Sequence, residues 1–96
     1  MHAAALRLEL RIPGARSLTD KRRILKALAA ELTTAFPVAV AEVGFQDQWQ
    51  RATLGAALVA AQAGQLERIV LAVPRRLRDH PEVELLEVGV SYLEER

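Results

Sequence analysis

The sequence contains no cysteine and no asparagine, and aromatic residues make up only 4% of its 96 positions. Without cysteine, the chain has neither disulfides nor thiolate zinc sites. No apolar run approaches the roughly 20 residues of a membrane span, and the N-terminal residues lack the apolar core of a signal peptide. We therefore expect a cytoplasmic protein that does not associate with membranes.

The composition is that of one globular domain, with 51% hydrophobic and 26% charged residues. No second domain fits into this length, so we expect a single domain over residues 1–96. A domain this small buries a comparatively low share of its surface and has no disulfide or thiolate metal site to stabilise it. We therefore expect it to form a homo-oligomer.

The net charge is only +1, but the charges are unevenly distributed. Residues 1–35 hold seven basic and three acidic side chains, whereas residues 82–96 hold one basic and five acidic side chains. Eleven of the thirteen basic residues are arginine, whose planar fork suits phosphate. The many alanines and the lack of asparagine point instead to a high-GC genome, and we favour that explanation of the arginines.

Hydrophobic periodicity divides the chain into six elements. Leu6, Leu8, Leu10 and Ile12 alternate with polar residues, which predicts a half-buried strand that ends at Pro13. Ser17 is a predicted N-cap, with Asp20 three residues on, for a helix over 18–36. Further strands are predicted over 38–45, 51–61 and 83–93, and a second helix over 64–79, with a kink at Pro74.

The order βαββαβ with a central hairpin favours a ferredoxin-like α+β fold. In this fold two right-handed split βαβ units form a four-stranded antiparallel sheet. We predict the strand order 4-1-3-2, with both helices on one face of the sheet.

Two stretches resemble a known family. ARSLTDKRRILKAL (15–28) and VAEVGFQDQWQRATLGAALV (40–59) are similar to the signature stretches of the YlxP-like family of small bacterial proteins of unknown function. The resemblance implies a ferredoxin-like fold. It also implies a link to ribosome assembly or translation, because genes of this family often lie beside those for ribosome-binding factor A. The chain departs from the family at Thr19, where lysine is usual.

Five basic residues gather around the start of the first predicted helix, where unpaired amides and the helix dipole also attract anions. On a helical wheel Lys21 shares the side of Leu25 and is expected to leave along the end of the sheet. An RNA-backbone contact and an ordinary solvated face are both open interpretations. The candidate anion- or nucleic-acid-binding residues are Arg16, Lys21, Arg22, Arg23 and Lys26.

Trp49, the only tryptophan, lies among amides and charges in the sequence QDQWQRATLG (46–55). Strand parity places it on the sheet face away from the helices, partly buried at the hairpin end. Base stacking, local packing over the hairpin and a subunit contact are all possible there, and we favour the subunit contact. The residues predicted to share this face are Arg7, Glu9, Arg11, Arg51, Thr53, Gly55 and Ala57.

Signals for catalysis are weak. His2, at an expected mobile terminus, and His80 lack ligand partners at recognisable spacing, so we expect no metal and no catalytic residue. No glycine-rich phosphate loop occurs, and no cofactor is expected. Acylphosphatases share the predicted fold but require an asparagine, which excludes that activity. Alternation makes Glu84 an inward-facing candidate in the last strand.

Two functional hypotheses remain. The first is a non-enzymatic accessory protein that contacts RNA or the ribosome through the basic start of the first helix. The second is a self-associating regulatory module that binds a small anion near Lys21. Salt dependence separates them, because phosphate contacts weaken steeply with added salt and an apolar interface does not.

Overall fold

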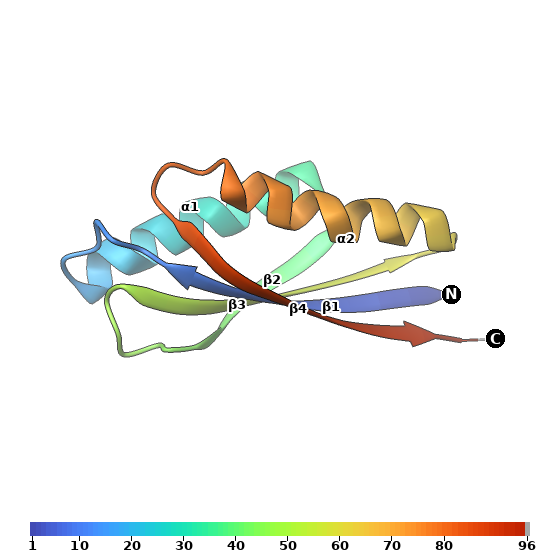
Figure 1. The fold of residues 1–96 in the computed structure, drawn as a ribbon, viewed down its shortest axis with the longest axis horizontal. Coiled ribbons are helices and arrows are strands. Elements are labelled where there is room, and N and C mark those ends of the chain that lie inside the picture. Colours follow the sequence, from blue (N-terminus) through green and yellow to red (C-terminus); the bar gives the residue numbers. More distant parts are fainter. Residues whose placement is uncertain (96) are drawn as a thin grey trace.

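The computed structural model describes residues 1–95, and Figure 1 shows two helices lying over one face of a twisted sheet. The elements follow the predicted order. They are β1 (His2–Arg11), α1 (Leu18–Ala35), β2 (Val38–Gly44), β3 (Arg51–Ala60), α2 (Ala63–Arg78) and β4 (Glu84–Glu94).

The sheet has the strand order β2-β3-β1-β4, and every neighbouring pair is antiparallel. This is the predicted order read from the other edge, and the ferredoxin-like fold is confirmed. Strand β1 begins earlier than the alternation of leucines indicates. His2 already pairs with Ala60 on one side and with Glu94 on the other, so the expectation of a mobile N-terminus was wrong.

Both helices begin and end close to the predicted residues. Ser17 caps α1, and its hydroxyl accepts a hydrogen bond of 3.0 Å from the Asp20 amide. The helix ends before Pro37, which disfavours helical backbone in the residue before it. Helix α2 continues past Pro74 to Arg78, and the Pro74 side chain is buried.

The core lies between the helices and the inward-facing side of the sheet. The inward side chains of β1 and β3, such as Leu6, Leu8, Leu54 and Leu58, are almost fully buried. No helix of residues 1–95 lies over the other side of the sheet, which is called the open face below. Within residues 1–95, no helix is long and apolar enough to cross a membrane.

Two irregularities change which way side chains point. The β2–β3 register shifts between Glu42 and Gly44, and the β1–β4 register shifts opposite Glu9 and Leu10. The second shift leaves Leu86 as an extra residue in β4 and moves Glu84 to the open face. The expectation that Glu84 points inward was therefore wrong, because simple alternation ignores a bulge.

The molecule is elongated, with extents of 46 × 21 × 19 Å. In Figure 1 the β1–α1 and β2–β3 loops lie at one end, and both termini lie at the other. We call these the loop end, formed by residues 12–17 and 45–50, and the termini end, formed by the start of β1 and the ends of β3 and β4.

Candidate functional site

The two loops of the loop end are joined by Gln50. Its side-chain amide donates to the carbonyl oxygens of Pro13, at 3.3 Å, and Ala15, at 3.2 Å. Its own carbonyl accepts a 2.9 Å hydrogen bond from the Ile12 amide. Gln50 thus fixes the position of the β2–β3 loop relative to the β1–α1 loop. Trp49 precedes Gln50 and Arg16 follows Ala15, so both lie at the same end of the molecule.

Lys21 ties α1 to the same loop from inside the protein. Only 1% of the residue is exposed, and its Nζ donates to the Phe45 carbonyl at 2.6 Å. Nζ also lies 2.7 Å from Glu42 Oε2, in an ion pair whose carboxylate is poorly aligned for a hydrogen bond. Lys21 lies on the inward side that the helical wheel indicated and reaches the end of the sheet as predicted, but its ammonium already has partners inside the fold and is not an exposed member of the basic group.

Phe45 has an unusual backbone and an arginine over its ring. Its φ of 57° is the one positive φ of a non-glycine residue in the described chain. Such a conformation is costly and persists only where its surroundings fix it, and here the Lys21 ammonium holds its carbonyl. The Arg51 guanidinium lies 4.5 Å from the centre of the Phe45 ring, in a cation–π contact.

Trp49 lies in the loop between β2 and β3, outside both strands, with 53% of its surface exposed. Trp49 is thus partly buried, as predicted, but it lies in the loop and not on the sheet face that strand parity indicated. Its neighbour Gln50 is fixed by three hydrogen bonds, so an exposed indole is carried on a well-positioned backbone.

The other four predicted basic residues are exposed, and they differ in whether an acidic residue lies nearby. Arg23 lies 3.9 Å from Glu82, a distance that contributes little at the surface. Arg16, Arg22 and Lys26 have no salt bridge with any residue in 1–95. Of the predicted cluster, these three are available to bind an anion.

The remaining predicted residues lie on the open face. Arg7 is 3.8 Å from Glu9, and Arg11 is 3.9 Å from Glu84. Glu9 also accepts a short hydrogen bond from the buried Thr53 hydroxyl on the neighbouring strand. Arg7 and Arg11 therefore lie beside carboxylates on strand β1 of the open face and not in the two loops with Arg16.

Comparison with known proteins identifies the family. The model of "Protein of unknown function (DUF503)" matches residues 3–90, which is most of the chain. This chain belongs to the DUF503 family. It is 36% identical to "Uncharacterized protein YlxP" of Bacillus subtilis (strain 168) over 73 residues, which cover 76% of this chain and 79% of that protein.

Two solved structures of designed proteins are similar to this DUF503 chain. A de novo designed protein with a ferredoxin fold, LFR1 1, matches with a TM-score of 0.53 at 13% identity, covering 99% of this chain and 88% of the design. A second design, Ferredog-Diesel, has a TM-score of 0.47 at 9% identity and covers 93% and 83%. At these identities the first match supports the ferredoxin-like fold alone.

The two histidines of this DUF503 protein both lie beside carboxylates. His2 Nδ1 is 3.6 Å from Glu94, and His80 Nε2 is 3.8 Å from Glu31. His80 Nδ1 accepts a hydrogen bond from the Glu82 amide, which leaves the Nε2 proton facing Glu31. Within residues 1–95, no group of three or more histidine and acidic residues could hold a metal ion.

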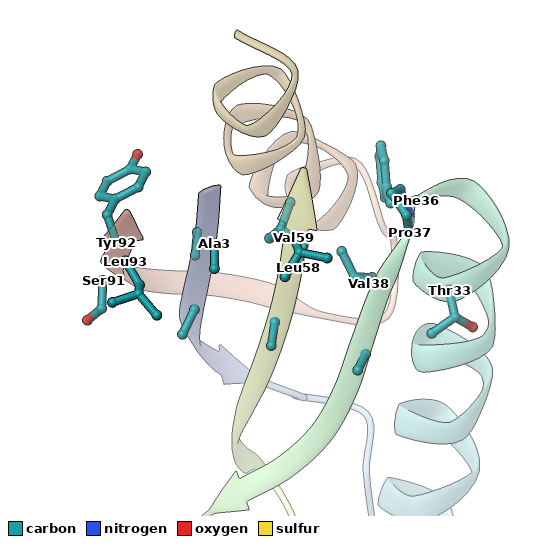
Figure 2. Close-up of a pocket in the computed structure, with 14 residues that line it drawn as sticks. Ala3, Thr33, Phe36, Pro37, Val38, Leu58, Val59, Ser91, Tyr92 and Leu93 are labelled. Atoms are coloured by element: carbon teal, nitrogen blue, oxygen red, sulfur yellow. The ribbon is translucent and has the colours of Figure 1, made fainter. Parts of the chain in front are cut away.

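Sequence reasoning missed Gln50 and Phe45 as parts of the loop end. A glutamine that bonds two backbone carbonyls 35 and 37 residues away leaves no periodic signal. The sequence likewise gave no sign of an open apolar pocket of about 700 Å³ at the termini end, which Figure 2 shows. The alternation of small residues was visible, but their grouping on adjacent strands depends on the register.

Proposed function

We propose that this protein is a non-enzymatic accessory factor that binds single-stranded RNA through the loop end. The observation that carries this proposal is Trp49, an exposed indole on a backbone fixed by Gln50, at the same end of the molecule as Arg16, which has no salt bridge within residues 1–95. We extend the same proposal to an association of this protein with the ribosome, since ribosomal particles expose single-stranded RNA segments.

The chemistry of the loop end suits an unpaired nucleotide. Single-stranded RNA is bound by stacking its bases on aromatic rings or arginine planes while basic side chains follow the phosphates. Trp49 offers a ring, and the Arg51 guanidinium over the Phe45 ring offers a second planar group. Arg16 and Arg22 supply unpaired positive charge at the start of α1.

The fixed backbone of the loop favours binding. A loop that is already ordered loses less conformational entropy when it binds a ligand. Lys21 and Gln50 provide that order from two sides, one through the Phe45 carbonyl and one through Pro13 and Ala15. The buried lysine thus supports the site without contacting RNA itself.

Binding of a labelled single-stranded oligoribonucleotide of about ten nucleotides, followed by fluorescence anisotropy, tests the proposal. Trp49→Ala should weaken binding about tenfold, because stacking on one aromatic ring contributes roughly 1–3 kcal/mol. Trp49→Phe should retain most of the affinity. An RNA duplex of the same length should bind more weakly, since its bases are not available for stacking.

Charge reversal provides the matched control. Arg16→Glu combined with Arg22→Glu should abolish binding at moderate salt, whereas Arg68→Glu on α2 should have a small effect, although it also reverses an exposed arginine. Arg22→Glu with Lys26→Glu should likewise remove co-sedimentation with ribosomal particles at low salt. The proposal fails if wild-type protein binds no oligonucleotide, or if Trp49→Ala binds as tightly as the wild type.

A further inference from the structure

We infer that the apolar half of the open face, at the termini end, is the interface of a homodimer in which two sheets pack face to face with their strands antiparallel. The predicted subunit contact around Trp49 lies at the other end of the face, where the side chains are charged. The new assignment rests on shape, charge and area, and it does not depend on RNA binding.

The strand register arranges the open face at the termini end in two rows that cross the strands. Val59, Ala3 and Leu93 are paired neighbours and form the outer row. The inner row consists of Ala57, Ala5 and Ser91, with Ala39 at the β2 edge. Val59 is 61% and Leu93 64% exposed, and with Ala3 between them they form a contiguous apolar surface.

The large side chains of the outer row stand out from the sheet, and the side chains of the inner row do not. Alanine and serine side chains are short, so the inner row forms a depression beside the larger Val59 and Leu93. The pocket of about 700 Å³ in Figure 2 spans both rows and extends to Thr33, Phe36 and Pro37 at the end of α1. A second depression of about 300 Å³ continues across Ala39, Ala57 and Gly55 as far as Val43.

This pattern is complementary to itself. A twofold axis that runs across the strands, between the two rows, places the outer row of one copy on the inner row of the other. Val59 then lies on the partner's Ala57, and Leu93 lies on the partner's Ser91. The same contacts form a second time by symmetry, as a closed dimer requires.

The charges along the same axis are also complementary. Glu95 continues β4, since its amide donates to the Met1 carbonyl at 3.1 Å, and alternation from Leu93 places it on the open face. The axis brings Glu95 over the partner's Gly89. A Cβ added to Gly89 would lie 2.6 Å from an Arg7 guanidinium nitrogen, so the arginine covers this glycine. Each Glu95 therefore meets the partner's Arg7.

The area agrees with a weak dimer. Four strands about 4.8 Å apart and five residues at about 3.3 Å each give roughly 300 Å² of flat sheet per copy. Two copies together bury roughly 600 Å² of flat sheet, to which the relief of the side chains adds, so the interface falls among weak contacts of less than about 1,200 Å². We expect dissociation in the micromolar range. In this arrangement the two loop ends point away from each other and stay free.

Sedimentation equilibrium over about 1–100 µM tests the dimer, with a monomer mass of 10.6 kDa. Val59→Asp should raise the dissociation constant at least tenfold, because it buries a carboxylate against alanine. Leu71→Asp is the matched control, since Leu71 is 56% exposed on α2, away from the sheet, and should assemble like the wild type. Urea unfolding of both variants verifies that they are folded.

Exchanging the charges tests the orientation of the two copies. Arg7→Glu and Glu95→Arg should each weaken assembly several-fold, and the two together should restore it, because the pair is re-formed with its signs reversed. A monomeric wild type over the whole range would overturn the inference. So would a Val59→Asp variant that assembles like the parent, or a double charge exchange that fails to recover assembly.

Discussion

The two ends of the molecule attach a helix to the sheet in opposite ways. At the loop end the link is Lys21, which is buried, hydrogen-bonded to the Phe45 carbonyl and ion-paired with Glu42. At the termini end it is the exposed Tyr92 hydroxyl, which donates to Glu67 of α2 at 2.9 Å. A buried polar contact fixes the backbone around it, because leaving it unmade is costly, whereas an exposed one competes with water.

The open face also differs between its two halves, one charged and the other apolar. Arg7, Glu9, Arg11 and Glu84 form ion pairs across its loop half, while its termini half is alanine-rich with exposed Val59 and Leu93. The loop half of the open face therefore has its charges paired with one another, whereas the termini half leaves apolar side chains that nothing within residues 1–95 covers. Substitutions at each end should consequently affect different properties.

The largest effect on stability should come from Lys21→Met. The variant leaves Glu42 half-enclosed without its ammonium partner, and breaking such a pair costs about 3 kcal/mol in the free energy of unfolding. Urea unfolding measures this change. Oligonucleotide binding should also weaken, because the Phe45 carbonyl is released, whereas dimerisation at the far end should be unchanged.

Lys26→Met is the matched control, since this lysine lies on the same helix but is exposed and unpaired. Its effect should stay within about 0.5 kcal/mol. Adding Glu42→Leu to Lys21→Met should recover part of the lost stability, because no carboxylate then remains unpaired. Equal costs for Lys21→Met and Lys26→Met would show that the buried link does not stabilise the loop end.

Gly44→Ala should have an intermediate effect. Its Cβ would lie 2.8 Å from the Thr53 hydroxyl oxygen and 3.0 Å from Thr53 Cβ, and this hydroxyl is the one that bonds Glu9. Overpacking of this kind costs about 1–3 kcal/mol in thermal or urea unfolding. Gly64→Ala, with no atom within 4 Å of the new Cβ, should be neutral or stabilising. Similar results for the two variants would contradict tight packing at the bulge.

The smallest effect should appear at the termini end, in the titration of Tyr92. Its hydrogen bond to Glu67 raises the pKa of the phenol above the usual 10.0, with smaller contributions from desolvation and from the Glu67 charge. The folded state therefore holds this proton more tightly, so the contribution to stability is complete below pH 10 and is lost as the pH rises through the folded-state pKa.

Tyr92 is the only tyrosine, so tyrosinate absorbance reports this pKa directly. Glu67→Gln should lower it toward 10, because the carboxylate acceptor and its charge are removed. An unchanged titration in Glu67→Gln would mean that the exposed contact does not persist in solution, which would sharpen the contrast with the buried Lys21.

Much of the fold followed from the sequence because each element carries a local signal. Alternating leucines predicted β1, Ser17 and Asp20 predicted the start of α1, and the order of elements predicted the sheet. The candidate site followed only in part. The loop and its exposed basic residues were identified, but the role of Lys21 was not, because a helical wheel does not show which carbonyl a long side chain reaches.

The sequence by itself determined the strands, the helices, the strand order and the side of the sheet on which most residues lie, since periodicity and capping act over a few neighbouring residues. Only the tertiary structure decided that Glu84 turns outward at a bulge, that Lys21 is buried against Glu42, and that Val59, Ala3 and Leu93 lie side by side. These three features depend on register and on contacts between distant segments, and register is a property of paired strands that no single segment contains.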